Sequence, residues 1–221
     1  MICINLKTYS NNSGTNIYSI LDPIADYFSK HQIDSKKLAF CPNNFQLESL
    51  KKAYPELQFI AQNVDPIPLG KNTGLNPVEL LKSIGIKYTL FNHSEHRSID
   101  SHINSKIDMI NSFGINAIVC CENIKEARQI IKSKPYAIAY EPPDLIASNF
   151  SILSRNVGYV SEFVEAVKGY SLPYLGAGIT SVNEINMGTK LGVKGFIIAR
   201  AFLDSPDKFE FVKGLIQALS N

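Results

Sequence analysis

Five polar side chains stand at or just beyond the ends of apolar runs of the chain: Asn5, Lys7, His93, Glu95 and Glu141. A carboxylate at the end of a buried strand is costly unless a partner or a reaction explains it. A carboxylate, an imidazole and an ammonium group are the groups needed to move a proton on a carbon next to a carbonyl. If the fold gathers these side chains, we therefore predict proton transfer as their chemistry.

Each of these side chains also has a simpler structural interpretation. Glu141 is compatible with a salt-bridged residue at a loop entrance, and Lys7 with a solvated cation. His93 is compatible with a core histidine that a backbone carbonyl satisfies. Glu95 and Arg97 are compatible with a surface ion pair. These interpretations stay open for each residue taken alone, and become less plausible only if one rim holds them all.

Small residues form two short stretches after the last two predicted strands. The first is 176–178, and the second is 199–201, which also contains one cation. Backbone N–H groups in such turns bind phosphate when they follow the seventh and eighth strands of a parallel barrel. Arg200, in the second stretch, is compatible with a phosphate contact, with an outward side chain and with obstruction of the pocket. The first stretch is also compatible with an ordinary tight turn. The candidate phosphate-binding residues are Gly176, Ala177, Gly178, Ala199, Arg200 and Ala201.

Eight apolar runs indicate the strands that must position these groups. Continuous apolar runs, as opposed to alternating ones, indicate strands that are buried on both faces and therefore parallel. Eight strand–helix units predict a closed (β/α)8 TIM barrel, an α/β fold, as a single domain over residues 1–221. A doubly wound open sheet is the competitor, but no GxGxxG occurs. The predicted strands are Ile2–Leu6, Leu38–Cys41, Leu57–Ala61, Tyr88–Phe91, Ile115–Cys121, Pro135–Tyr140, Leu172–Leu175 and Val193–Ala199.

Helical periodicity separates the strands. Ser181 is predicted to cap one helix, and Glu184 completes a capping box. Pro77 is predicted as the first residue of another helix. The apolar positions of the helices fall at residues 17–28, 45–50, 77–83, 99–110, 124–131, 157–167 and 209–219, in addition to the helix after Ser181.

Composition excludes some classes of function. The formal net charge of the 221 residues is +2, so no broad basic surface for nucleic acid is expected. No apolar run is long enough to span a membrane, and we expect no export segment at the start of the chain. The four cysteines lie in strand-like runs without zinc spacing and are expected to be reduced core thiols of a cytoplasmic protein.

The order of five motifs resembles the triosephosphate isomerase family, in its shorter archaeal-type branch, over essentially the whole chain. The motifs are Asn5-Leu6-Lys7, the segment AQNVDPIPLGKNTG at 61–74, Asn92-His93-Ser94-Glu95-His96-Arg97, Glu141-Pro142-Pro143 and Gly176-Ala177-Gly178. The resemblance implies a (β/α)8 barrel that interconverts dihydroxyacetone phosphate and D-glyceraldehyde 3-phosphate. It also implies that neither a metal nor an organic cofactor is needed.

The resemblance assigns a role to each polar side chain. Glu141 would remove the proton and return it to the neighbouring carbon. His93, kept neutral, would polarise the carbonyl, and Lys7 would supply positive charge to the oxyanion and the phosphate. Asn5 would orient the substrate oxygen, and Glu95 would position Lys7 or relay protons.

Two departures from the family pattern concern the phosphate. The lid expected at residues 144–154, with phosphate contacts at Ile146 and Ala147, contains no glycine, and Arg200-Ala201 replaces a pair of small residues. Two alternatives therefore stay open. One is a different phosphosugar isomerase or epimerase, and the other is a drifted barrel that is weakly active or a non-catalytic binding or oligomeric protein.

The long loop Gln62–Asn76 is rich in Gly and Pro, and it is too long to be only a connector. In the family this loop inserts into a second subunit. The resemblance thus implies a homodimer with Thr73 near the neighbour's active site; the sequence leaves open a tetramer, and also a loop that is only a flexible surface element. The expected small-molecule partner is a phosphorylated triose, with no nucleic acid and no membrane.

Overall fold

The computed structural model describes residues 1–145 and 151–219, and eight parallel strands form its centre. All eight lie within or next to the apolar runs of the sequence, because a strand covered on both faces needs apolar side chains on both. The strands are β1 (Ile2–Asn5), β2 (Leu38–Cys41), β3 (Gln58–Phe59), β4 (Tyr88–Phe91), β5 (Asn116–Cys121), β6 (Ala137–Tyr140), β7 (Leu172–Leu175) and β8 (Gly195–Ile198).

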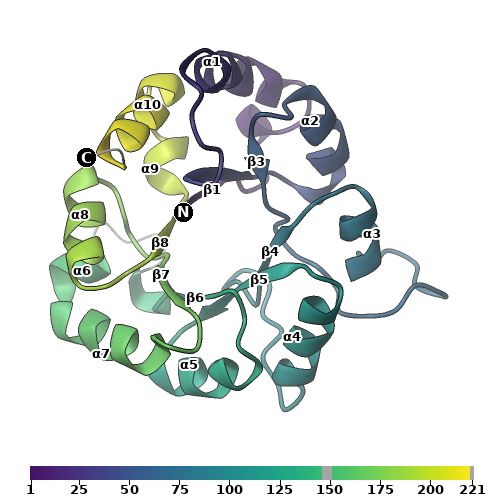
Figure 1. The fold of residues 1–221 in the computed structure, drawn as a ribbon, viewed down its shortest axis with the longest axis vertical. Coiled ribbons are helices and arrows are strands. Elements are labelled where there is room, and N and C mark those ends of the chain that lie inside the picture. The colour runs from purple at the N-terminus through teal and green to yellow at the C-terminus, as the bar shows by residue number, and fades with distance from the viewer. Residues whose placement is uncertain (146–150, 220–221) are drawn as a thin grey trace.

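The strands close into the predicted barrel. Their order around the sheet is β3-β2-β1-β8-β7-β6-β5-β4. The two ends of this order meet at Ala61, which bridges Thr89 in parallel. The N–H of Ala61 donates to the Tyr88 carbonyl at 3.0 Å, and the N–H of Leu90 donates to the Ala61 carbonyl at 2.8 Å. Figure 1 shows the resulting ring of strands with helices outside it.

Helices cover the outer surface of the barrel (Figure 1), as is required when every strand is parallel to its neighbours. The α-helices of the described residues are α1 (Asn16–His31), α2 (Leu47–Ala53), α3 (Val78–Ser83), α4 (Ile103–Ser112), α5 (Ile124–Ile130), α6 (Ile152–Arg155), α7 (Val157–Val167), α8 (Val182–Lys190), α9 (Arg200–Leu203) and α10 (Lys208–Ala218). The capping box predicted for α8 is confirmed, with both the Ser181 and the Glu184 hydrogen bonds present.

Most predicted strands differ from the observed ones by one or two residues at one or both ends, and two predicted helix starts differ as well. The helix expected from Ile99 begins at Ile103, because the carboxylate of Asp100 accepts the N–H of His102 at 2.8 Å and forms a turn before the helix. Pro77 precedes α3, with an extended ψ of 146°. The third strand is shorter than Leu57–Ala61 and has only Gln58 and Phe59 as regular strand residues.

The apolar core has two parts. One lies between the strands and the helices, and the other fills the inside of the barrel with alanines, cysteines, isoleucines, one leucine and Tyr174. Cys3, Cys41, Cys120 and Cys121 are buried and free, which confirms that they are unpaired core thiols. No helix in the described ranges combines the length and the apolar composition that a bilayer crossing requires.

Candidate active site

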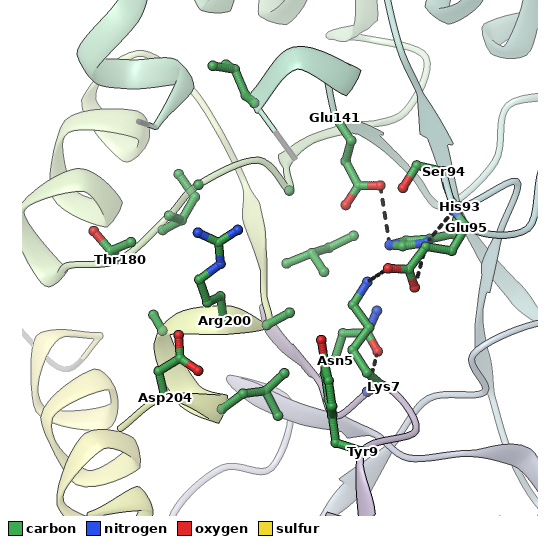
Figure 2. A pocket seen from close by; sticks show the side chains of 18 of the residues that line it. Asn5, Lys7, Tyr9, His93, Ser94, Glu95, Glu141, Thr180, Arg200 and Asp204 are labelled. Carbon is green, nitrogen blue, oxygen red and sulfur yellow. Dashed lines mark hydrogen bonds and ion pairs between the residues drawn. The ribbon is translucent and has the colours of Figure 1, made fainter. Parts of the chain in front are cut away.

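A cavity of about 410 Å³ opens at the carboxyl ends of the strands. Side chains that follow β1, β4, β6, β7 and β8 line it, as expected for the loop face of a (β/α)8 barrel. Figure 2 shows Asn5, Lys7, His93, Glu95 and Glu141 gathered on one side of this cavity. The barrel therefore brings together the five polar side chains that the sequence analysis singled out.

Glu141 lies at the buried end of the cavity and is 3% exposed. Its backbone N–H donates to the carbonyl of Cys121 at 2.9 Å, which fixes its position relative to β5. Its Oε2 atom is buried and has no hydrogen-bond partner among the described residues. The nearest basic atom is Nε2 of His93, at 3.7 Å. The salt-bridged loop residue considered from sequence is thus not observed: among the described residues no lysine or arginine pairs with Glu141, and the imidazole of His93 is its basic neighbour.

Gly176 provides the space that the Glu141 side chain occupies. A Cβ atom added at this position would lie 2.6 Å from Cγ of Glu141 and closer still to its Oε1. The N–H of Gly176 donates to the carbonyl of Tyr140 at 3.1 Å, so the backbone is held there by the strand pairing. A glycine is therefore required here to bring the backbone after β7 against the carboxylate.

His93 is held in one neutral tautomer. Its Nδ1 atom accepts the backbone N–H of Glu95 at 3.1 Å, so this nitrogen carries the lone pair. The ring proton is then on Nε2, the nitrogen that faces Glu141. The core histidine bonded to a backbone carbonyl, which the sequence left open, is not observed, because the ring accepts from the backbone and lines the cavity.

Lys7 directs its ammonium group into the same region. Nζ lies 2.8 Å from Oε1 of Glu95 (Figure 2). Arg97 instead pairs with Glu126 at 2.7 Å and lies 3.5 Å from Glu122. The predicted link between Lys7 and Glu95 is confirmed as a contact, and the alternative surface pair between Glu95 and Arg97 is not observed.

Lys7 also adopts an uncommon backbone conformation, with a φ of +54°. Three hydrogen bonds hold this turn. The N–H of Lys7 donates to Oδ1 of Asn5 at 3.1 Å. The amide of Gln62 donates to the carbonyls of Lys7 at 3.0 Å and Cys41 at 3.1 Å. Gln62 belongs to the motif at 61–74, but its support of the Lys7 turn is not predictable from that motif.

The other end of the cavity contains most of the predicted phosphate-binding residues. Gly176, Gly178, Ala199, Arg200 and Ala201 line it, whereas Ala177 is buried and does not. Ile146 and Ala147 lie outside the described residues. Figure 2 shows the guanidinium of Arg200 pointing into the cavity.

Several lining residues were missed by the sequence analysis. Tyr9, Asn12, Thr180 and Asp204 contribute to the cavity wall, and so does Ser94, whose buried Oγ has no hydrogen-bond partner in the described parts of the chain. Ser94 stood inside the His93 motif and could have been included on that ground. Tyr9, Asn12 and Thr180 have no signal beyond their place in the loop after a strand, and Asp204, at the end of α9, has none.

The thiol of Cys120, in the core of the barrel, is poorly suited to act as a nucleophile. Burial raises the pKa of Cys120 well above its ordinary value of 9.0, and the nearby carboxylate of Glu141 raises it further. A thiol needs a lowered pKa to react as a thiolate. No group of three or more His, Cys, Asp or Glu side chains in the described parts of the chain is arranged to hold a metal ion.

Comparison with known proteins gives a consistent result. The family model described as triosephosphate isomerase matches residues 1–216. A triosephosphate isomerase from Cenarchaeum symbiosum is 31% identical and covers 100% of this chain and 98% of its own. One from Thermoplasma volcanium is 30% identical over 98% of this chain and 99% of its own. One from Saccharolobus solfataricus is 28% identical over 100% and 98% of the two chains.

The close approach of Gly176 to Glu141 is testable. In Gly176→Ala the added methyl group must displace the carboxylate, so we expect a crystal structure in which Glu141 lies farther from His93 than the present 3.7 Å. Overpacking of this kind costs about 1–3 kcal/mol of stability. Gly214→Ala in α10 is the matched control, because a Cβ there meets nothing within 4 Å. An unmoved Glu141 in the Gly176 variant would contradict this account.

Proposed function

The chain belongs to the triosephosphate isomerase family, and we propose that Glu141 and His93 carry out its interconversion of dihydroxyacetone phosphate and D-glyceraldehyde 3-phosphate. The observation that supports this assignment best is the pair of side chains across the cavity, with Oε2 of Glu141 3.7 Å from Nε2 of His93. This oxygen has no hydrogen-bond partner among the described residues and is available to accept a proton.

In the first step, the Glu141 carboxylate takes a proton from the substrate carbon next to the carbonyl. The electron pair of that C–H bond becomes the carbon–carbon double bond of an enediolate, and the carbonyl electrons move onto oxygen. The protonated carboxyl then returns the proton to the neighbouring carbon, which completes the exchange of ketone and aldehyde. No net oxidant or second substrate is needed.

His93 stabilises the oxygen on which charge develops. Its Nε2–H donates towards that oxygen while the Glu95 N–H occupies Nδ1. A neutral imidazole in this role is the known arrangement in triosephosphate isomerases and is carried over to this chain. Lys7 adds a positive charge near the oxyanion, and Asn5 orients the oxygen. Glu95, 2.8 Å from Nζ of Lys7, holds the ammonium group in place.

The phosphate binds at the other end of the cavity. Backbone N–H groups of Gly178, Ala199 and Ala201 supply neutral donors, and Arg200 adds a cation that points into the cavity. Gly176 lines the cavity too, but its N–H already donates to the carbonyl of Tyr140. The phosphate contacts predicted for Ile146 and Ala147 stay a prediction. The family assignment does not favour the two alternatives, a different phosphosugar enzyme and a non-catalytic barrel.

We further propose a homodimer formed through the loop Gln62–Asn76, with Thr73 near the partner's site. The base of the loop is ordered, because Asp65 and Asn76 exchange hydrogen bonds at 2.8 and 2.6 Å. Its Leu69 and Leu75 side chains are exposed, and the loop projects beyond the helices in Figure 1. An ordered projection with exposed leucines supports an interface better than a flexible surface loop. We also propose that the protein acts in the cytoplasm, where free thiols persist.

Glu141→Asp tests the proposed base. The substitution withdraws the carboxylate by one methylene, and a misplacement of about 1 Å can lower turnover on the order of 100-fold. We expect such a loss of kcat in a coupled isomerase assay, with an unchanged circular dichroism spectrum. Glu165→Asp, at an exposed position of α7, is the matched control and should keep full activity. Wild-type turnover in Glu141→Asp would exclude Glu141 as the base.

Arg200→Ala tests the phosphate contact. Because Arg200 is exposed, its contribution is screened, and we expect KM to rise roughly fivefold while kcat changes less. Arg128→Ala removes a comparably exposed guanidinium elsewhere and should have no effect. An unchanged KM would mean that Arg200 does not meet the phosphate, and a lower KM would mean that it obstructs the pocket.

Light scattering tests the dimer. We expect a mass of twice the 24.5 kDa of one chain, or a higher multiple if dimers pair. Leu75→Glu places a charge on the loop and should lower the mass to that of one chain, because a buried unpaired charge opposes association. Met187→Glu, at an exposed position of α8, is the control and should leave the mass unchanged. A wild-type monomer would refute the interface.

A further inference from the structure

Asn92 is the last residue before His93, and its side chain makes two internal hydrogen bonds. It is completely buried. Its Nδ2 donates to the carbonyl of Cys120 at 2.8 Å, and its Oδ1 accepts the N–H of Ser98 at 2.7 Å. One amide therefore joins the end of β4 to β5 and to the far end of the segment 93–98.

The backbone of Asn92 has a φ of +58°. This conformation turns the chain at the end of β4, and asparagine tolerates it better than most residues do. Glycine would adopt it at no steric cost but would supply neither hydrogen bond. Glycine and asparagine can both adopt the positive φ at this position. Of the two, only asparagine also supplies the hydrogen bonds to Cys120 and Ser98.

The segment that Asn92 closes carries two groups of the site. Inside it the N–H of His96 donates to the carbonyl of His93 at 2.8 Å. The N–H of Glu95 sets the tautomer of His93, and the Glu95 carboxylate meets Lys7. A shift of either end of the segment would change both contacts together.

The hydrogen bond from Asn92 to Cys120 connects the His93 segment to the region that holds Glu141. Cys120 adjoins Cys121, whose carbonyl accepts the N–H of Glu141 at 2.9 Å. The Asn92 amide therefore ties the His93 segment to β5, the strand to which the backbone of Glu141, at the end of β6, is also hydrogen-bonded. The two side chains that lie 3.7 Å apart across the cavity are thus both connected to β5.

We propose that Asn92 is a positioning residue for the isomerase reaction, acting through the placement and tautomer of His93. This inference rests on the proposed function of His93 and Glu141. Asn92 does not line the cavity, so it has no direct part in binding the substrate. Its effect should consequently appear in turnover and not in the affinity for the phosphate.

Asn92→Gly separates the cross-link from the torsion. We expect the variant to fold, with kcat lowered about 10- to 100-fold by misplacement of His93 and KM changed less than about threefold. Asn92→Ala should lose kcat to a similar extent and should also have a lower Tm, because alanine disfavours the positive φ. Gln32→Gly, at a φ of +51° at the end of α1, is the matched control and should leave kcat unchanged.

A ¹⁵N NMR spectrum of imidazole nitrogens gives a readout that does not depend on activity. In the wild type we expect His93 Nδ1 to show an unprotonated, hydrogen-bonded nitrogen, and in Asn92→Gly we expect this signature to be lost. Normal kcat in the glycine variant with a loss only in Asn92→Ala would mean that the torsion alone matters, and would overturn the proposal. An unchanged Nδ1 signal would overturn it as well. If the wild type is inactive but the Nδ1 signal changes in Asn92→Gly, the proposed function is refuted and the positioning role of Asn92 is supported.

Discussion

The site depends on one constraint: Oε2 of Glu141 is buried and finds no hydrogen-bond partner among the residues that the structure describes. Desolvation of such a group costs on the order of several kcal/mol, so surrounding structure must prevent the side chain from turning elsewhere. The pairing of Glu141 with Cys121 fixes its backbone, and the absence of a side chain at Gly176 lets the neighbouring strand approach it. The energy for this arrangement comes from the two apolar layers that hold the barrel together.

The charges around the cavity are nearly balanced before a substrate arrives. Lys7 and Arg200 are the cations among the described lining residues, and Glu95, Glu141 and Asp204 are the carboxylates. Lys7 is already paired with Glu95, so its field at the reacting oxygen is reduced by a neighbour that also positions it. The site therefore relies on orientation as much as on net charge: donors fixed in advance need no reorganisation when charge develops on the substrate.

Much of this architecture could be predicted from the sequence because its determinants are local or repeated. Continuous apolar runs mark strands buried on both faces, and Ser181 with Glu184 marks a helix start. The start of α4, at Ile103, was predicted four residues too early. The apolar residues continue the helical period back to Ile99, but the side chain of Asp100 forms a turn that ends the helix there. The partner of Glu95 depended on long-range closure: Arg97 was equally eligible by spacing, and only the barrel brings Lys7 close. The direction of Arg200 likewise depends on neighbours that spacing does not reveal.

The strand pairs of the barrel differ in how many residues they join by backbone hydrogen bonds. Between most neighbours several residues are paired, whereas the junction of β3 and β4 consists of Ala61 alone, with its two backbone hydrogen bonds. If the barrel opens transiently, the parting occurs there, because the fewest bonds must break. The loop Gln62–Asn76 begins directly after Ala61. A contact that restrains this loop therefore also restrains the junction of β3 and β4.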